Sequence, residues 1–291
     1  MRPPAPHGFE YVTLGVPDLD EVREFLEYHV GLVPVERDEA RLTMRADVEH
    51  HCVDLRARPD LSEAEVIALG FSVGSADALD DLKRRVDDAG RDVIPLDDLA
   101  KDVCTGGFAT VDPSGVRLEL VDEFHVWAEP PMVELRPLDI VHPFIATPHF
   151  DESLAFYTDA LGFLASDYIA NQTAFLRGED RYHHSLALRR SDTVSVDHIA
   201  FAMKSFDHVM RAHGRARYRG VNVTSDIVNH SASRSIAFYM HEPRIGPPIE
   251  LCDGHHVLTP EEHETNRPRR MSLDPRNIDV WRAAADDWGL R

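Results

Sequence analysis

Cysteine is scarce in this sequence, and long apolar runs are missing from it. The 291 residues include three cysteines, Cys52, Cys104 and Cys252, which are scattered and odd in number. Such usage is typical of a reducing compartment, so we expect a cytoplasmic protein. No apolar stretch is long enough to span a bilayer, and Met1 is not followed by a signal peptide. We therefore expect no membrane association.

Basic residues are also few relative to acidic ones. Lys and Arg together number 31 and Asp and Glu together 51, which gives a formal net charge of −20. A charge of this sign repels a phosphate backbone, so we expect no nucleic-acid partner. The remaining composition is that of a soluble globular protein, and a small molecule is the partner to look for.

The sequence repeats its own frame at an offset of about 131 residues. The following segments align: Val16-Pro17 with Thr147-Pro148, Gly31-Leu32 with Gly162-Phe163, and Leu118-Glu119-Leu120 with Ile249-Glu250-Leu251. A chain of this length is sufficient for two domains that each bury their own core. The predicted division is a first module at 1–125, a proline-containing linker at 126–138, a second module at 139–258 and a tail at 259–291.

Each module combines strands and helices in a similar order. Strands are predicted at 9–16, 67–73 and 196–203, and helices at 19–29, 76–89 and 151–160. Glycine follows directly or closely after each helix, as it does at Gly31, Gly90 and Gly162. We predict an α+β fold in which each module curls a sheet around a cavity and carries its helices outside.

Two histidines and one glutamate in the second module are candidate metal ligands. Alternation along 196–203 sends Ile199, Phe201 and Met203 to the core and His198 to the opposite face. The same reasoning sends Glu250 to that face, and His142 lies in the strand that opens the module. Two imidazoles and a carboxylate can hold a divalent iron on one face and leave the other open. The aligned positions of the first half are Tyr11, Ala68 and Glu119, so only the second half is expected to bind metal.

Three further side chains of the second module could supply acid–base chemistry. Alternation places His184 on one face with Leu186 and Leu188. His230 precedes a strand, and Tyr239 is expected on the Glu250 side of its hairpin. Imidazoles and a phenol near a metal can supply a base, an acid and a hydrogen-bond donor to an oxyanion.

These motifs in this order resemble a known family. The second module resembles the catalytic domain of two-domain type I extradiol catechol dioxygenases, of the 2,3-dihydroxybiphenyl 1,2-dioxygenase type, within the vicinal oxygen chelate superfamily. The motifs that carry the resemblance are the opening strand with His142, the pair His183-His184, the strand Val196-Asp-His198-Ile-Ala-Phe and the segment from His230 to Tyr239. The resemblance spans both modules and implies paired βαβββ units with one metal, in the C-terminal module.

The resemblance also implies roles. It makes His142, His198 and Glu250 the ligands of Fe(II), or of Mn(II), which shares this ligand set. It makes His184 the acid/base and places His230 and Tyr239 against the substrate hydroxyls. With O2 as co-substrate, the reaction would open a catechol, such as a 3-substituted or biphenyl-type one, to a muconic-semialdehyde-type product in aromatic catabolism. We expect a homo-oligomer.

Two alternatives and several minor expectations complete the sequence-based picture. A metal-dependent isomerase or epimerase of the glyoxalase type would use the same modules, and a metal-free binding protein would use only the hollow. We expect residues between 168 and 175 and around Ala202 to set substrate choice, and His183 to be structural. His255 and His256 could suggest further ligands, but their place just past the last strand favours a solvated turn. The tail, with a short helix over 280–288, is assigned no chemistry.

Overall fold

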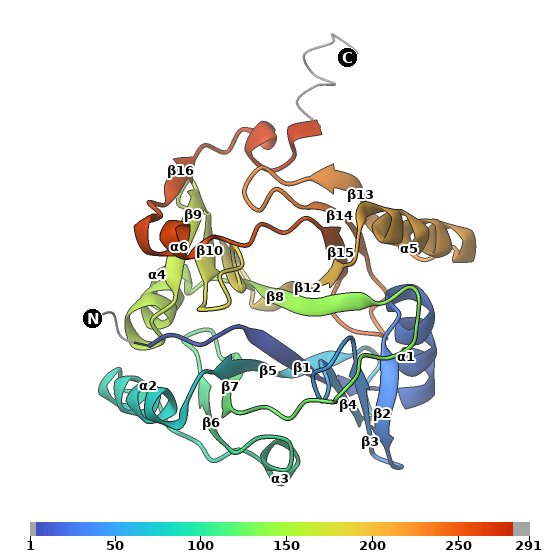
Figure 1. The fold of residues 1–291 in the computed structure, drawn as a ribbon, viewed down its shortest axis with the longest axis horizontal. Coiled ribbons are helices and arrows are strands. Elements are labelled where there is room, and N and C mark those ends of the chain that lie inside the picture. The colour runs from blue at the N-terminus through green and yellow to red at the C-terminus, as the bar shows by residue number, and fades with distance from the viewer. Residues whose placement is uncertain (1–3, 282–291) are drawn as a thin grey trace.

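Two curled sheets stack against each other to form the body of the protein (Figure 1). The computed structural model describes residues 4–281, and of residues 98 and 99 only the backbone. The mixed α+β architecture predicted from the sequence is confirmed. None of the helices within 4–281 has the length and apolar character needed to cross a membrane.

The first sheet has seven strands in the order β2-β3-β4-β1-β5-β7-β6. Its strands are β1 (Phe9–Val16), β2 (Val33–Arg37), β3 (Arg41–Arg45), β4 (Val53–Ala57), β5 (Glu65–Val73), β6 (Gly106–Val111) and β7 (Arg117–Asp122). The central pairs β1–β4 and β5–β7 are parallel, and β1–β5 is antiparallel.

The second sheet repeats this pattern and adds two strands, in the order β13-β14-β15-β12-β8-β11-β10-β9-β16. Its strands are β8 (Pro137–Thr147), β9 (Leu164–Ile169), β10 (Thr173–Arg177), β11 (Leu186–Arg190), β12 (Ser195–Met203), β13 (Val223–Asn229), β14 (Ile236–Met240), β15 (Ile249–Asp253) and β16 (Arg269–Met271). The two sheets fit the predicted division at 125 and 139, which itself stays a prediction.

Helices are present near the three places where the sequence predicted them, 19–29, 76–89 and 151–160, and the other helices lie where none was predicted. They are α1 (Leu19–Phe25) with its π-helical continuation η1 (Leu26–Val30), α2 (Ala76–Asp88), α3 (Asp98–Lys101), α4 (Phe150–Ala155) with η2 (Phe156–Ala160), α5 (Phe206–Arg219), α6 (Pro260–Thr265) and the 3-10 turn η3 (Pro275–Asn277). Asp18 caps α1 by accepting hydrogen bonds from two backbone N–H groups, and Gly31 ends the π turn at φ 89°. Both modules carry the π turn at the same place.

In each module, an arginine on a helix donates a hydrogen bond to a carbonyl oxygen in the π turn of the other module. Arg85 of α2 donates a hydrogen bond to the carbonyl oxygen of Ala160 in η2, at 2.8 Å. Arg215 of α5 donates to the carbonyl oxygen of Tyr28 in η1, at 3.1 Å. This reciprocal pair follows from the internal repeat, and it joins the modules into one body.

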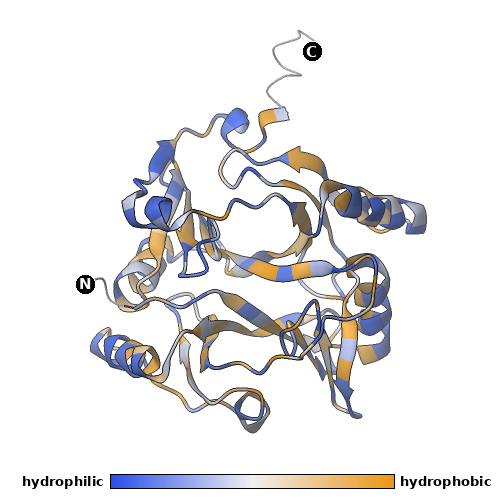
Figure 2. Ribbon diagram, in the orientation of Figure 1, coloured by the Kyte–Doolittle hydropathy of each residue, from blue (hydrophilic) through white to orange (hydrophobic). Residues whose placement is uncertain are grey.

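A shared hydrophobic core lies between the two sheets. One cluster of buried side chains contains residues of β1 and β5 together with residues of β8 and β12. Within it, the rings of Phe71 and Phe163 pack edge to face with their centroids 5.6 Å apart. Figure 2 shows β8 as largely hydrophobic and helices α2 and α5 as largely hydrophilic. The large faces predicted for β12 are confirmed, because Ile199, Phe201 and Met203 all lie in this core.

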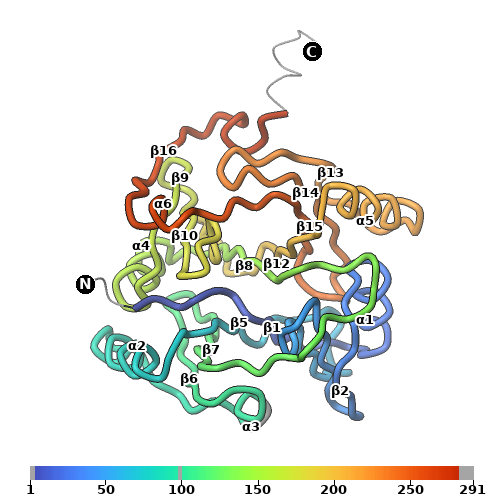
Figure 3. Tube along the Cα trace, in the orientation of Figure 1, coloured from blue at the N-terminus to red at the C-terminus, as the bar shows by residue number. Residues whose placement is uncertain are grey.

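The first described residues and the segment after residue 259 both contact the second module. The backbone carbonyls of Pro6 and His7 accept hydrogen bonds from the N–H groups of Glu179 and Asp180, and Figure 3 shows this dark blue segment running along the boundary between the two halves. At the other end, β16 pairs in parallel with β9. The 259–291 segment is therefore partly built into the second sheet, whereas most of the helix predicted at 280–288 lies outside the described residues.

Candidate metal centre and catalytic cavity

Three neighbouring strands bring His142, His198 and Glu250 together. The order β15-β12-β8 places Ala200 of β12 directly between His142 of β8 and Glu250 of β15, because Ala200 is the register partner of both. Cross-strand partners share a face, and His198 lies two residues from Ala200 on that same face. The small side chain of Ala200 leaves the space over the strand free for the three donor groups.

The donor atoms of these residues converge on one point. The Nε2 atoms of His142 and His198 are 3.1 Å apart, and Oε2 of Glu250 lies 3.4 Å from the first and 3.0 Å from the second. Ligands at right angles around an ion about 2.1 Å away are themselves about 3 Å apart. The spacing and the donor types thus fit a divalent metal of the iron or manganese kind.

Burial prepares these groups for a metal. It lowers the pKa of His142 to about 4, so the imidazole is neutral at pH 7 and can bind a metal through Nε2 once the proton that Nε2 donates to Glu250 leaves. Burial alone would raise the pKa of Glu250, but hydrogen bonds from His142 and His198 outweigh it and hold that pKa well below its ordinary value. The site is therefore a buried carboxylate facing two imidazoles, which a cation would compensate.

A cavity of about 540 Å³ opens above this centre. Its apolar wall includes Phe144, Ile169, Phe175, Val228 and Ile278. The ring of Phe144 stacks on the ring of His198, with the two centroids 5.0 Å apart. The expected lining between 168 and 175 is present. Ala202 is not among the lining residues, so that expectation was wrong.

A larger hollow of about 1060 Å³ lies elsewhere, next to α1. Charged side chains dominate its lining, and several already pair with each other, such as Arg244 with Glu21 at 2.7 Å. The cavity over His142 combines metal-type donors with an apolar wall, which is the usual make-up of a small-molecule site. We therefore place the candidate site in the smaller cavity.

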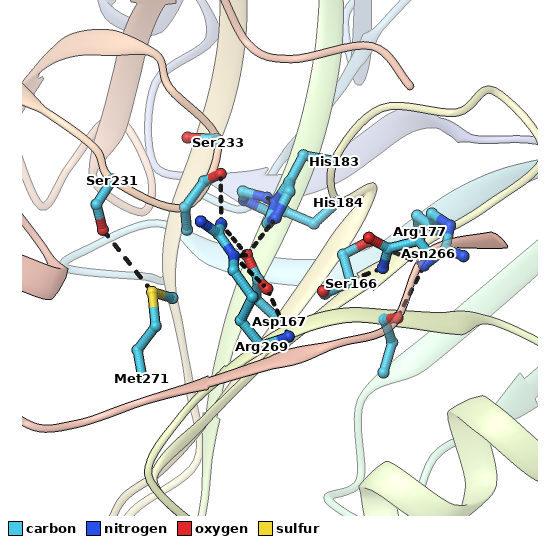
Figure 4. A network of polar contacts seen from close by, with 12 residues as sticks. Ser166, Asp167, Arg177, His183, His184, Ser231, Ser233, Asn266, Arg269 and Met271 are labelled. Carbon is cyan, nitrogen blue, oxygen red and sulfur yellow. Dashed lines mark hydrogen bonds and ion pairs between the residues drawn. The ribbon is translucent and has the colours of Figure 1, made fainter. Parts of the chain in front are cut away.

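His184 reaches the metal centre through a hydrogen-bonded chain. Nε2 of His184 is 3.3 Å from Nε2 of His142, while its Nδ1 is 3.1 Å from Nδ1 of His183. Nε2 of His183 is 2.9 Å from Oδ2 of Asp167, which Arg269 also binds (Figure 4). A carboxylate accepts only, so His183 donates from Nε2, accepts at Nδ1, and leaves His184 with its lone pair on Nε2.

The ionised carboxylate of Asp167 stabilises this hydrogen-bonded chain. Burial would raise the pKa of Asp167, but the hydrogen bonds from His183 and Arg269 outweigh it and lower that pKa to about 2. Burial keeps the pKa of His184 well below its ordinary value. His183, which the sequence suggested to be structural, orients His184 here.

His230 and Tyr239 lie together at the opposite wall. Nδ1 of His230 donates to the carbonyl oxygen of Ile278 at 3.2 Å, and its Nε2 accepts from the hydroxyl of Tyr239 at 2.8 Å. Burial and the charge of Glu250 raise the pKa of Tyr239 well above its ordinary value, so the phenol keeps its proton. The structure thus brings all six predicted site residues around one cavity, while their roles stay predictions.

Two features of the site were missed by the sequence. The tail contributes Asn277, Ile278 and Asp279 to the cavity wall, although no chemistry was assigned to it. His255 was interpreted as part of a solvated turn, and this was wrong, since only 7% of it is exposed. Its ring lies 4.6 Å from the ring of His184.

Comparison with known proteins places the second module in a family. Residues 139–247 match the model of the Glyoxalase/Bleomycin resistance protein/Dioxygenase superfamily. They form a domain of that superfamily. The resemblance to vicinal oxygen chelate proteins that the sequence motifs indicated is thereby confirmed.

Relatives of this superfamily domain cover both modules. Biphenyl-2,3-diol 1,2-dioxygenase of Paraburkholderia xenovorans is 28% identical over 256 residues, which are 80% of this chain and 83% of that protein. The protein of the same name from Metapseudomonas furukawaii is also 28% identical, over 80% of this chain and 82% of its own.

Solved structures share the fold of the whole chain. The Mn(II)-bound glyoxalase of Novosphingobium aromaticivorans superposes with a TM-score of 0.84 at 24% identity, covering 95% of this chain and 91% of that one. The 2,2′,3-trihydroxybiphenyl 1,2-dioxygenase of Sphingomonas wittichii gives a TM-score of 0.81 at 22% identity, covering 95% and 98%.

Proposed function

We propose that this protein is an Fe(II)-dependent extradiol dioxygenase, which cleaves a catechol beside its two hydroxyl groups and inserts both atoms of O2. The observation that carries the proposal is the convergence of His142, His198 and Glu250 at the base of a cavity that also contains His184, His230 and Tyr239. The relatives named biphenyl-2,3-diol 1,2-dioxygenase support the reaction type. The product would be of the muconic-semialdehyde type, as in aromatic catabolism.

The three ligands suit a redox-active metal with open positions. When bound, Fe(II) would supply a Lewis acid for the catechol oxygens and a redox centre through which O2 takes electrons from the ring. Mn(II) would fit the same two imidazoles and carboxylate. Both catechol hydroxyls and O2 would then be held beside one another, which removes most of the entropic cost of their meeting.

His184 is suited to move the proton. The chain from Asp167 through His183 leaves a lone pair on Nε2 of His184, directed at His142 and the metal centre. In this arrangement His184 takes a proton from a catechol hydroxyl and returns it to oxygen during ring opening. Asp167 steadies the charged imidazole by accepting from His183.

His230 and Tyr239 are suited to hold the substrate. Tyr239 keeps its proton and donates, and His230 is fixed by the carbonyl oxygen of Ile278 so that Nε2 faces the cavity. Tyr239 can donate its hydroxyl hydrogen to a catechol oxygen and stabilise the negative charge that develops on it. Nε2 of His230 can accept a hydrogen bond from a catechol hydroxyl. The apolar wall of Phe144, Phe175 and Ile169 suits an aromatic ring with an apolar substituent.

An isomerase of the glyoxalase type is the weaker reading. All three candidate ligands come from the second module, and the cavity presents an acid–base histidine together with a phenol. The first module offers Tyr11 and Ala68 at the matching positions, and among the residues that the structure describes no metal-type cluster joins the two modules. A metal-free binding protein would have no use for the converging donors.

Ring cleavage tests the proposal directly. The protein is loaded with Fe(II) without air and then exposed to air with catechol, 3-methylcatechol and 2,3-dihydroxybiphenyl, while visible absorbance is followed. We expect a yellow product that requires Fe(II), disappears in Glu250→Gln, and survives in the matched first-module variant Glu119→Gln. Iron bound at one ion per chain with no product from any catechol would overturn the dioxygenase reading and favour the isomerase.

A further inference from the structure

His255 is a buried histidine for which the proposed reaction has no use. It lies two residues after the end of β15, behind a turn at Gly254 with φ 77°. Only 7% of its surface is exposed. Within residues 4–281, neither of its ring nitrogens has a hydrogen-bond partner. Leaving a buried polar atom unpaired costs about 1–3 kcal/mol, so two such nitrogens call for a ligand.

The nitrogens around His255 form a second donor set. One ring nitrogen from each of His142, His184 and His255 lies within 4.8 Å of the others, and all three residues are buried. The ring centroid of His255 is 4.6 Å from that of His184 and 5.4 Å from that of His142. Three converging imidazoles without a carboxylate are a ligand set of zinc proteins.

His184 already presents a free lone pair to this set. The chain through His183 to Asp167 gives His184 a donor at Nδ1 and leaves Nε2 bare, 3.3 Å from Nε2 of His142. A carboxylate–histidine chain behind a ligand is also the usual support of zinc-bound imidazoles. The same contacts that suit His184 to take a proton therefore suit it to bind an ion.

We propose that His142, His184 and His255 form a second metal position, which takes Zn(II) and excludes the metal of the first position. Exclusion follows from His142, since its Nε2 lies 3.1 Å from His198 and 3.3 Å from His184 and a lone pair binds one ion. The all-nitrogen set suits four-coordinate Zn(II), whereas the set with Glu250 offers a carboxylate oxygen that iron and manganese also accept.

Zinc bound at this second position would inhibit turnover. It would take His142 away from the first metal and His184 away from proton transfer. Only this consequence for turnover rests on the proposed function; the binding of zinc does not.

Removing the first position isolates the second. In the double variant His198→Ala/Glu250→Gln, Zn(II) titration against a chromophoric chelator should find one ion per chain. Adding His255→Leu should weaken binding at least about 100-fold, since even partners behind a ligand are worth 10–100-fold. His256→Leu, the adjacent histidine, should change nothing. Failure of the folded double variant to bind Zn(II), or equal affinity after His255→Leu, would overturn the proposal.

A second measurement uses the protein without changes at the first position. Fe(II)-loaded protein is challenged with Zn(II), and released iron is measured by its ferrous chelate rather than by turnover. Wild type should release iron at lower Zn(II) than His255→Leu, because the shared His142 is withdrawn. Equal release of iron by wild type and His255→Leu would mean that zinc replaces iron at the first position. This result would contradict the second metal position and would leave the proposed dioxygenase activity unaffected.

Discussion

Tyr11 donates a hydrogen bond of 2.7 Å to Glu119 where the second module has His142 and Glu250. Gly70 lies between the two in register, as Ala200 does in the second sheet. A Cβ at Gly70 would come within 2.3 Å of the Tyr11 ring, so glycine is required for the phenol to lie across the strand. The first module thus fills with a tyrosine the space that the second keeps for a metal.

Replacing Tyr11 by phenylalanine should therefore destabilise the fold without touching metal binding. Glu119 is buried and, among the described residues, would keep Arg117, at 3.0 Å, as its charged side-chain partner. We expect the free energy of unfolding to fall by about 1–3 kcal/mol in urea. Tyr218→Phe, at an 85% exposed tyrosine, should change it by less than about 0.5 kcal/mol. A loss of metal in Tyr11→Phe would contradict this separation of the modules.

Alanine at His142 and at His184 should have different effects. His142→Ala removes a ligand, so both metal content and activity should be lost. His184→Ala keeps His142, His198 and Glu250, so the first position should stay loaded while turnover falls about 10²- to 10⁴-fold. Metal analysis and kcat on the same preparations check both, and wild-type turnover in His184→Ala would refute its acid–base role.

Asp167 should make stability depend on pH below neutrality. Its folded pKa of about 2 lies below the ordinary 3.8, so its contribution is fully present above about pH 4 and is lost as pH falls towards 2. Asp167→Asn should cost at most about 2 kcal/mol at pH 7. In urea unfolding, the difference in free energy of unfolding between wild type and Asp167→Asn should vanish as the pH falls from about 4 to about 2. Asp192→Asn, at an exposed carboxylate, serves as the control.

The tail segment should contribute to substrate affinity. Asp279 accepts hydrogen bonds from the backbone N–H of Asn229 at 3.1 Å and of Trp281 at 3.0 Å, which holds Ile278 against the cavity. Loss of these in Asp279→Ala should raise the KM for a catechol about fivefold, equivalent to about 1 kcal/mol, with metal content unchanged. Glu261→Ala, exposed and outside the cavity, should leave KM as it is.

Local signals were sufficient for three of the helices and for the face of the sheet on which the ligands lie. Asp18 and Gly31 mark the ends of a helix by their own chemistry, and strand alternation fixes the face of His198 once Ile199 and Phe201 are seen to be core residues. The internal repeat then singled out two of the 17 histidines, His142 and His198, together with Glu250, because the first half repeats the frame without the histidines.

Distant contacts decide what the sequence could not show. His255 is buried because the next residue is tied at both backbone groups, His256 N–H to Ser233 and His256 C=O to His183, far away in the chain. Ile278 joins the cavity through a hydrogen bond from His230 to its carbonyl oxygen. Neither contact leaves a periodic or motif signal, so a turn and a plain tail were the natural expectations.

His255 also makes a prediction about stability. In the metal-free protein its two nitrogens are buried without partners, so His255→Leu should not weaken the fold and should raise the free energy of unfolding by about 1–2 kcal/mol. Adding Zn(II) should reverse the order, because wild type gains the binding energy and the variant does not. Thermal unfolding with and without Zn(II) checks this, with His256→Leu as the control. A metal-free His255→Leu protein that is markedly less stable would mean that the imidazole is already satisfied by packing or water, and the case for a ligand there would fall.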